Sequence, residues 1–298
     1  MFYGCIARKA KEGDDRRMID LHTHTTSSDG TDSPFALVKK ALSVGVTTLG
    51  IADHDTTSGW DEAVTAIQPQ IELVLGAEIS CLTRDGVSVH MLGLLFDGED
   101  EQMQNMLRDS RDTRIPRMRK MVELLQADGI SISLDDVYAA APTGATVGRP
   151  HLADALVANG VVASRDEAFT DLLHNDSKYY VTHAAPTPVE AITTIRSAGG
   201  VAVIAHAFAS RRGEVITPAT FSDLVAAGMH GIEVDHRDHS AAERAQLRDI
   251  ATELSLVITG SSDYHGTGKL NAMAENTTHP AQWERLESMA NARRVVRK

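Results

Sequence analysis

Cysteine is scarce in this sequence, and long apolar runs are missing from it. The 298 residues contain two cysteines, Cys5 and Cys81, which cannot form a disulfide framework and fit a reducing cytoplasm. No apolar run approaches the roughly 18 residues that span a bilayer, and the first residues contain no apolar stretch of signal-peptide length. We therefore expect a cytoplasmic protein without membrane contact, and nothing in the sequence indicates an obligate protein partner.

Positive charge is also in short supply. Lys and Arg number 29 against 41 Asp and Glu, so the formal net charge is −12 at pH 7. A field of this sign repels nucleic acid and phosphate esters, and the chain has no basic stripe that could follow a duplex. We therefore do not expect binding of duplex nucleic acid. A phosphate-handling site would need a local source of positive charge, such as bound metal ions.

Short β-branched and apolar runs alternate with segments of helical periodicity. In one such segment Leu247, Ile250, Ala251 and Leu254 recur at i, i+3, i+4 and i+7, just before the last apolar run. Strands that alternate with helices of this length predict βα units and a mainly parallel, buried sheet. The seven predicted strands are residues 18–24, 46–55, 71–80, 87–96, 201–207, 231–236 and 256–265.

The alternation stops between about residue 100 and residue 182, where helical patterns replace strands. Met118, Met121, Val122 and Leu125 form one apolar stripe there. We interpret this region as a mostly helical insertion into an α/β domain. The predicted organisation is a polar N-terminal tail at 1–17, a first barrel part at 18–99, the insertion as a substrate cap at 100–182, and a second barrel part at 183–298, with Met18 as an alternative start.

Polar side chains gather where the predicted strands end. In a barrel of parallel βα units, the carboxyl ends of the strands meet on one face, where active sites are built. Six imidazoles and three carboxylates form a donor set that suits zinc, manganese or iron, and they would serve two or three divalent ions. Alone, each could be a hydrogen-bonded or turn residue, but together they predict a metal centre of His22, His24, Asp29, His54, Glu78, His90, His206, Asp263 and His265.

Five of these strand ends carry motifs of a known family. The segments DLHTHTTSSDG, IADHD, GAEIS, VIAHA and GSSDYHG resemble, in order, those of the PHP (polymerase and histidinol phosphatase) superfamily of metal-dependent phosphoesterases. The resemblance implies an α/β fold, a distorted (β/α)7 barrel, here with the helical insertion. SVHMLGLLFD, VGRPHLADALVANG and KYYV are similar to the branch that hydrolyses nucleoside 3′,5′-bisphosphates and short oligonucleotide 5′ ends.

Resemblance to that branch implies a trinuclear site, commonly with manganese, although zinc or iron would also fit the donors. A hydroxide that bridges the ions would attack phosphorus in line, so no protein nucleophile is needed. In the implied division, one ion is held by His22, His24, Glu78 and Asp263, a second shares Glu78 and adds His90 and His206, and the third takes Asp29, His54 and His265.

The insertion is expected to supply most substrate contacts. Arg149 and Lys178 resemble positions where the family carries phosphate-binding cations; an arginine suits a forked grip on phosphate and a lysine a point charge. His151 could contact substrate or cap a helix. The full set of predicted substrate contacts is Arg114, Arg117, Arg149, His151, Lys178, His236 and His239.

These observations lead to one main hypothesis and two alternatives. The main hypothesis is a metal-dependent phosphoesterase that releases phosphate from nucleoside 3′,5′-bisphosphates, with 5′→3′ exonuclease action on very short oligonucleotides. The first alternative is a histidinol-phosphate phosphatase, which would share the metal ligands but would not need the GRPH and KYYV segments. The second is a non-catalytic PHP module that supports a polymerase through protein contacts.

Overall fold

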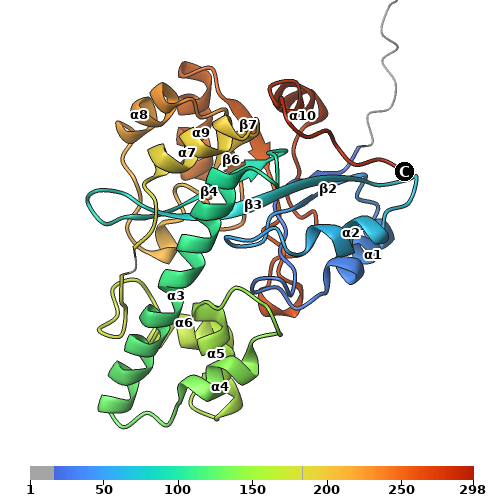
Figure 1. Ribbon diagram of the computed structural model, residues 1–298. Helices are drawn as coiled ribbons and strands as arrows, with labels where there is room; N and C mark the ends of the chain where they lie inside the picture. Colours follow the sequence, from blue (N-terminus) through green and yellow to red (C-terminus); the bar gives the residue numbers. More distant parts are fainter. Residues whose placement is uncertain (1–16, 183) are drawn as a thin grey trace, which may run out of the picture.

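A seven-stranded sheet forms the centre of the molecule (Figure 1). The computed structural model describes residues 17–182 and 184–298, so nearly all of the predicted N-terminal tail lies outside the described residues. A bridge between Thr23 and Tyr264 joins the two edges of the sheet and nearly closes it into a barrel. The strands follow the order of the chain: β1 (Ile19–Asp20), β2 (Thr48–Ile51), β3 (Glu72–Leu82), β4 (Ser88–Leu94), β5 (Val201–Ala205), β6 (Gly231–Asp235) and β7 (Val257–Gly260).

The sheet is mainly parallel, as predicted, but the alternation of strands and helices is interrupted once. β4 runs antiparallel to both β3 and β5, and the other neighbouring strands are parallel. A tight turn joins β3 to β4, in which Thr83 N–H donates to Val87 O and Gly86 has a φ of 93°. His90, near the start of β4, therefore lies opposite Ser80, near the carboxyl end of β3.

In the described part of the chain, six helices lie outside the stretch between β4 and α7 or at its end. Ser33 caps the start of the α1 helix (Pro34–Val44), because its side chain accepts a hydrogen bond from Ala36 N. Gly45 caps the end of this helix with a φ of 90°, which few other residues adopt. Gly228 ends the α8 helix in the same way, with a φ of 100°. The six are α1 (Pro34–Val44), α2 (Trp60–Thr65), α7 (Pro188–Ser197), α8 (Thr220–Ala227), α9 (Ala241–Glu253) and α10 (Pro280–Glu287).

Among the described residues, four helices lie between β4 and α7, within the range 100–182 where a helical insertion was predicted. The longest begins at Asp100, whose side chain accepts from Met103 N, and extends from the sheet toward the other three (Figure 1). Its predicted apolar stripe is buried in a small separate core with Leu152 and Leu156. The four are α3 (Glu101–Ala127), α4 (Leu134–Ala140), α5 (Arg149–Ala158) and α6 (Arg165–Asp171). None of the helices that the structure describes is long and apolar enough to cross a membrane.

The inward face of the barrel changes from apolar to polar along the strands. Because side chains alternate between faces, Val74 shares a strand face with Glu78, and Leu92 shares one with His90. Val74 and Leu92 belong to a buried cluster that packs against Trp283 of α10. The apolar end is therefore filled, and the polar end is left to build a site.

Candidate metal centre

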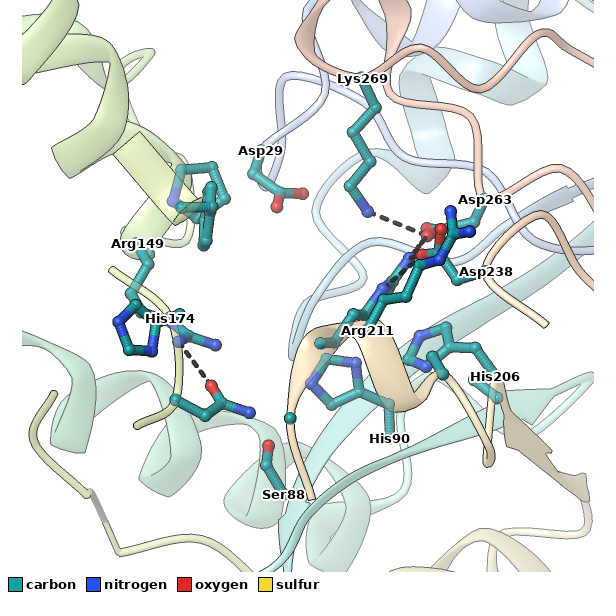
Figure 2. Close-up of a pocket in the computed structure, with 18 of the residues that line it drawn as sticks. Asp29, Ser88, His90, Arg149, His174, His206, Arg211, Asp238, Asp263 and Lys269 are labelled. Atoms are coloured by element: carbon teal, nitrogen blue, oxygen red, sulfur yellow. Dashed lines mark hydrogen bonds and ion pairs between the residues drawn. The ribbon is translucent and has the colours of Figure 1, made fainter. Parts of the chain in front are cut away.

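Glu78 lies at the middle of the nine side chains predicted as metal ligands. Its side chain is 1% exposed. Figure 2 shows Asp29, His90, His206 and Asp263 facing one cavity. Glu78 also lines this cavity. Its two carboxylate oxygens lie within 3.3 Å of five imidazole nitrogens: His90 Nδ1 at 2.8 Å, His206 Nε2 at 3.0 Å, His54 Nδ1 at 3.1 Å, His24 Nε2 at 3.2 Å and His22 Nε2 at 3.3 Å.

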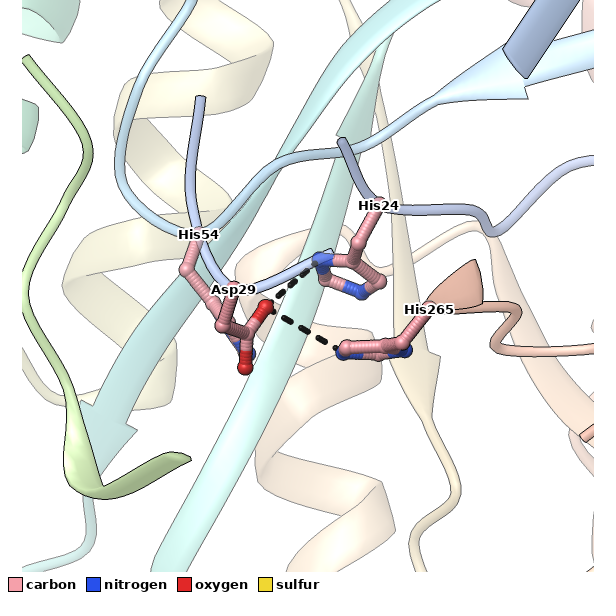
Figure 3. Close-up of side chains that lie close together, drawn as sticks. All are labelled: His24, Asp29, His54 and His265. Atoms are coloured by element: carbon pink, nitrogen blue, oxygen red, sulfur yellow. Dashed lines mark ion pairs between the residues drawn. The ribbon is translucent and has the colours of Figure 1, made fainter. Parts of the chain in front are cut away.

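Asp29 and Asp263 complete the ring of acidic groups. An oxygen of Asp29 is 3.2 Å from His265 Nε2 and 3.6 Å from His24 Nδ1, and the second oxygen is 3.6 Å from His54 Nε2 (Figure 3). Asp263 Oδ1 is 3.4 Å from His24 Nε2. His24 thus faces all three carboxylates, and the nine predicted residues form one continuous cluster.

The backbone is strained at two of these residues. His206 and Asp263 have φ values of 29° and 53°, in the left-handed region that side chains disfavour. Such conformations persist only when surrounding contacts hold them, and they gather at functional sites. In the turn that carries Asp29, a Cβ on Gly30 would lie 2.5 Å from His24 O, so only glycine fits there.

Three further buried carboxylates hold the ring in place. Asp53 accepts hydrogen bonds from Thr25 N at 2.8 Å and Ser28 Oγ at 2.6 Å, which fixes the turn before Asp29. Glu233 of β6 accepts from His22 Nδ1 at 3.0 Å and from His206 N at 2.9 Å. Asp20 supports the segment before Asp263 in the same way, through the Ser262 backbone and hydroxyl. Hydrogen bonds of this kind orient ligands around a metal.

Charge pairing sets the protonation of the cluster. Burial would raise the pKa of Asp29, Glu78 and Asp263, but neighbouring positive groups, chiefly imidazoles, outweigh it and hold each pKa well below its usual value. Burial would lower the pKa of His24, yet Asp263 and Glu78 raise it to about 9. Burial lowers the pKa of His206 to about 3, so this imidazole is neutral, as a metal ligand must be. The ionised carboxylates attract cations to this point.

The donor atoms fit divalent metal ions. Three buried imidazole nitrogens, His54 Nδ1, His236 Nε2 and His265 Nε2, have no hydrogen-bond partner among the described residues. His54 Nδ1 lies 3.1 Å from Glu78, and His265 Nε2 lies 3.2 Å from Asp29, but neither pair is aligned as a hydrogen bond. Buried polar atoms rarely stay unpaired. Nitrogens and carboxylate oxygens that crowd together without bonding one another are suited to share an ion.

Four groups of potential ligands emerge within the described chain. In each group the ligand atoms lie within 4.8 Å of one another. His24 joins the Asp29 group, and His90 groups with His54, whereas the family resemblance assigns these residues to different ions. The division among ions therefore stays a prediction. The groups are His24, Asp29, His54 and His265; His22, His24 and Asp263; His22, Glu78 and His206; and His54, Glu78 and His90.

Known proteins are similar in sequence to this chain over most of its length. A 5′-3′ exoribonuclease of Haemophilus influenzae is 34% identical over 250 residues, which are 84% of this chain and 90% of that protein. The model of the PHP domain matches residues 20–132. The chain belongs to the PHP family. A 3′,5′-nucleoside bisphosphate phosphatase of Chromobacterium violaceum is 31% identical, over 84% of this PHP chain and 88% of its own.

Solved structures agree with this assignment. One from Bifidobacterium adolescentis, described as a metal-dependent phosphoesterase, superposes with a TM-score of 0.88 and 40% identity. The match covers 93% of this PHP chain and 97% of that one. The protein is therefore a metal-dependent phosphoesterase with the barrel of its family.

A cavity of about 920 Å³ opens over the cluster of potential ligands in this PHP protein. Residues of α5 and of the segment after α6 lie on one wall, and residues that follow β7 lie on the opposite wall. Figure 2 shows Arg149 and His174 on one side, and Asp263 and Lys269 on the other. The cavity is much larger than one phosphate group, so it has room for the remainder of a nucleotide.

Arg149 and Arg117, two of the predicted substrate contacts, lie in the cavity lining. Arg149 donates to Leu173 O and to Asn175 Oδ1, at 2.8 and 2.7 Å, and its guanidinium stacks 5.2 Å from the Tyr180 ring. Burial and the charge of Arg149 lower the pKa of Arg117 to about 9. Neither arginine forms an ion pair within the described residues. Two adjacent guanidiniums without an acidic partner suit an anion.

Arg114 lines the same cavity but is already bound to other groups. Its Nε donates to Asp55 Oδ2 at 3.0 Å, and its Nη2 donates to Ser80 Oγ at 2.8 Å. Asp55 in turn accepts from Ser80 N in β3. Arg114 therefore ties α3 to the barrel, and its predicted phosphate contact would have to compete with Asp55.

The structure does not bring the other predicted substrate residues into the cavity lining. Lys178 is mainly exposed and pairs with Asp128 at the end of α3. His151 is buried, and its Nδ1 accepts from Gly148 N at 3.0 Å, so it caps α5. His239 accepts from Phe208 N and donates to Val234 O. His236 is buried behind Asp263, with Nε2 3.4 Å from Oδ2.

Glu233 supports the ligand cluster and was not predicted, although the sequence contains a signal for it. Glu233 lies inside the apolar run GIEVDH, in which a charged side chain is unusual for a buried strand. It is fully buried, and the neighbouring His22 lowers its pKa to about 2 against the effect of burial. A buried acid in such a strand needs a partner, and this one holds two predicted ligands.

Proposed function

We propose that this protein releases phosphate from nucleoside 3′,5′-bisphosphates, and that the same site removes nucleotides from the 5′ ends of very short oligonucleotides. We further propose that it works with three divalent ions, with manganese as the preferred metal. The relatives named for bisphosphate hydrolysis and for 5′-3′ exoribonuclease action support this choice of substrate.

The observation that carries the proposal is the position of the clustered ligands at the floor of a large, partly cationic cavity. Eight imidazole and carboxylate groups surround Glu78, and two arginines without an ion-pair partner among the described residues lie in the wall above them. A phosphomonoester needs positive charge at the reacting phosphate, and a bisphosphate needs it at a second point as well. With divalent ions bound at the ligand cluster, this cavity would offer both, although the net charge of the chain is −12.

The residues that would hold the ions are the nine clustered histidines and acids. When bound, divalent ions would activate water at neutral pH and neutralise charge on the phosphate. Glu233 and Asp53 keep the imidazoles and the Asp29 turn in place through the hydrogen bonds described above. The chain itself therefore contributes orientation and charge, and no serine or cysteine needs to act as a nucleophile.

The second phosphate of the substrate would bind at Arg149 and Arg117. The Nη1 of Arg149 is fixed by Leu173 O and Asn175 Oδ1, and the ring of Tyr180 supports its flat face. Arg117 is anchored by its Nε at Val181 O, 2.6 Å away, and it also stacks on Tyr180. Fixed guanidiniums lose little entropy on binding phosphate, so this wall would select substrates with two phosphates.

Two alternatives are not favoured. Histidinol phosphate has one phosphate and would leave the arginine wall unpaired. Two relatives that each match 84% of the chain are named for RNA and for a nucleoside bisphosphate. A non-catalytic module would not need the complete ligand cluster that lies around Glu78.

A phosphate-release screen tests the proposal. The protein is stripped of metal, refilled separately with Mn, Zn, Fe or Mg, and given adenosine 3′,5′-bisphosphate, mononucleotides, dinucleotides and histidinol phosphate. We expect the highest kcat/KM with manganese and the bisphosphate. A higher kcat/KM for histidinol phosphate, or activity without any metal, would refute the proposal.

A further inference from the structure

Two cations of the barrel wall meet one oxygen of a predicted metal ligand. Arg212 Nη2 and Lys269 Nζ each lie 2.9 Å from Asp263 Oδ2. The other oxygen, Oδ1, faces the imidazoles of His22 and His24. Arg212 belongs to the short turn η1 (Ser210–Arg212), and Lys269 follows the turn η2 (Gly266–Gly268). Both side chains line the cavity. Figure 2 shows Lys269 across the cavity from Arg149.

Asp263 Oδ2 has three side-chain nitrogens near it, which is more than it can accept hydrogen bonds from. His236 Nε2 is a third nitrogen near this oxygen, at 3.4 Å. A carboxylate oxygen has about two acceptor positions, and Asp263 would also share its charge with a metal ion. At least one of the two cations could therefore bind another anion without leaving Asp263 unpaired.

Lys269 is the cation that is free to serve another group. Arg212 has a second acidic partner, because its Nε donates to Asp238 Oδ2 at 2.6 Å. Within residues 17–182 and 184–298, Asp263 is the one acidic partner of Lys269. The side chain of Lys269 is 29% exposed, and its long stem lets the ammonium reach a neighbouring anion.

We propose that Lys269, with Arg212 held beside it, binds the non-bridging oxygens of the reacting phosphate. The proposal rests on the proposed function, and it adds a phosphate contact from the barrel to those from the insertion. Charge-assisted hydrogen bonds to phosphate are short and strong, and they strengthen as negative charge grows on the transferred group. The two phosphates of a bisphosphate would then meet cations on opposite walls: Lys269 and Arg212 at the reacting group, and Arg149 and Arg117 at the other.

A purely structural role for Lys269 would have a different signature. If its ammonium only neutralised Asp263, its removal would change metal binding and leave the affinity for phosphate unchanged at equal metal content. Lys269→Met keeps the length of the side chain and removes the charge, whereas Lys269→Arg keeps the charge. Arg211→Ala is a matched control, because Arg211 also lines the cavity and is exposed, but no contact joins it to Asp263 among the described residues.

The experiment uses the manganese-loaded protein and inorganic phosphate as the probe. Metal content is measured by mass spectrometry and phosphate affinity by titration calorimetry. We expect Lys269→Met to weaken phosphate binding about tenfold or more at unchanged metal content, with Lys269→Arg and Arg211→Ala within about threefold of the wild type. Unchanged phosphate affinity in Lys269→Met, equal weakening in Arg211→Ala, or loss of metal from Lys269→Met would each overturn the proposal.

This test is independent of the identity of the nucleotide substrate. If the wild type does not hydrolyse adenosine 3′,5′-bisphosphate, the proposed function is wrong. The titration would still show whether Lys269 contributes to phosphate affinity. With an active wild type, Lys269→Met is also expected to lower kcat about tenfold to hundredfold. A change confined to KM would contradict a contact with the reacting group.

Discussion

Replacing the carboxylate of Glu78 by an amide removes one charge and almost no volume. Because the side chain is 1% exposed, water does not screen the loss. A unit charge about 4 Å from another contributes about 4 kcal/mol at an effective dielectric constant of about 20, which is roughly a thousandfold in affinity. We therefore expect Glu78→Gln to weaken the binding of each ion that it contacts by about that factor. Activity should fall by at least as much.

Metal content and activity of Glu78→Gln are measured on the same samples. Bound manganese is determined after dialysis against a fixed free concentration, and phosphate release is then followed in the same buffer. Glu123→Gln is the matched control, because Glu123 is exposed on α3 and pairs only with Lys120 among the described residues. A Glu78→Gln protein that keeps full metal occupancy, or that keeps its activity after losing metal, would refute the central position of Glu78.

Three further predictions follow from the site. Arg149→Ala should raise KM for adenosine 3′,5′-bisphosphate about tenfold or more at unchanged metal content, whereas KM for a mononucleotide stays within about twofold; equal kinetics for mutant and wild type would remove Arg149 from the site. Glu233→Gln should weaken metal binding about tenfold to hundredfold, because His22 loses its orienting partner; wild-type affinity in a titration would contradict this. Metal binding should release protons at pH 7.5, since the pKa of His24 is raised to about 9 and its bound proton must leave. Affinity should then increase with pH up to about 9, and calorimetry in buffers of different ionisation enthalpy that finds no proton release would exclude the mechanism.

The ends of the strands could be predicted because polar residues there interrupt an otherwise apolar pattern. His22, Glu78 and Asp263 each interrupt or follow a buried run, and side chains at such places converge in a barrel. The direction of β4 could not be predicted, since an apolar run reads the same for parallel and antiparallel strands. The reversal at Gly86 is what brings His90 beside Glu78.

Contacts of single cations were harder to predict than the ligand cluster. Lys178 lies in a segment that resembles the family, but its ammonium forms an ion pair with Asp128, which is far away in the sequence. His151 proved to be a helix cap, because a free backbone N–H at Gly148 lies within its reach. Lys269 lies in no recognised motif, and its contact with Asp263 is visible only in the folded structure. Pairings of this kind depend on tertiary distances that spacing along the chain does not contain.

The most direct test of the metal centre is anomalous X-ray diffraction at the manganese edge from crystals of the manganese-loaded protein. We predict three peaks among the nine clustered side chains, with Glu78 in contact with two of them. A single peak, or peaks remote from Glu78, would contradict the existence of a shared multinuclear site.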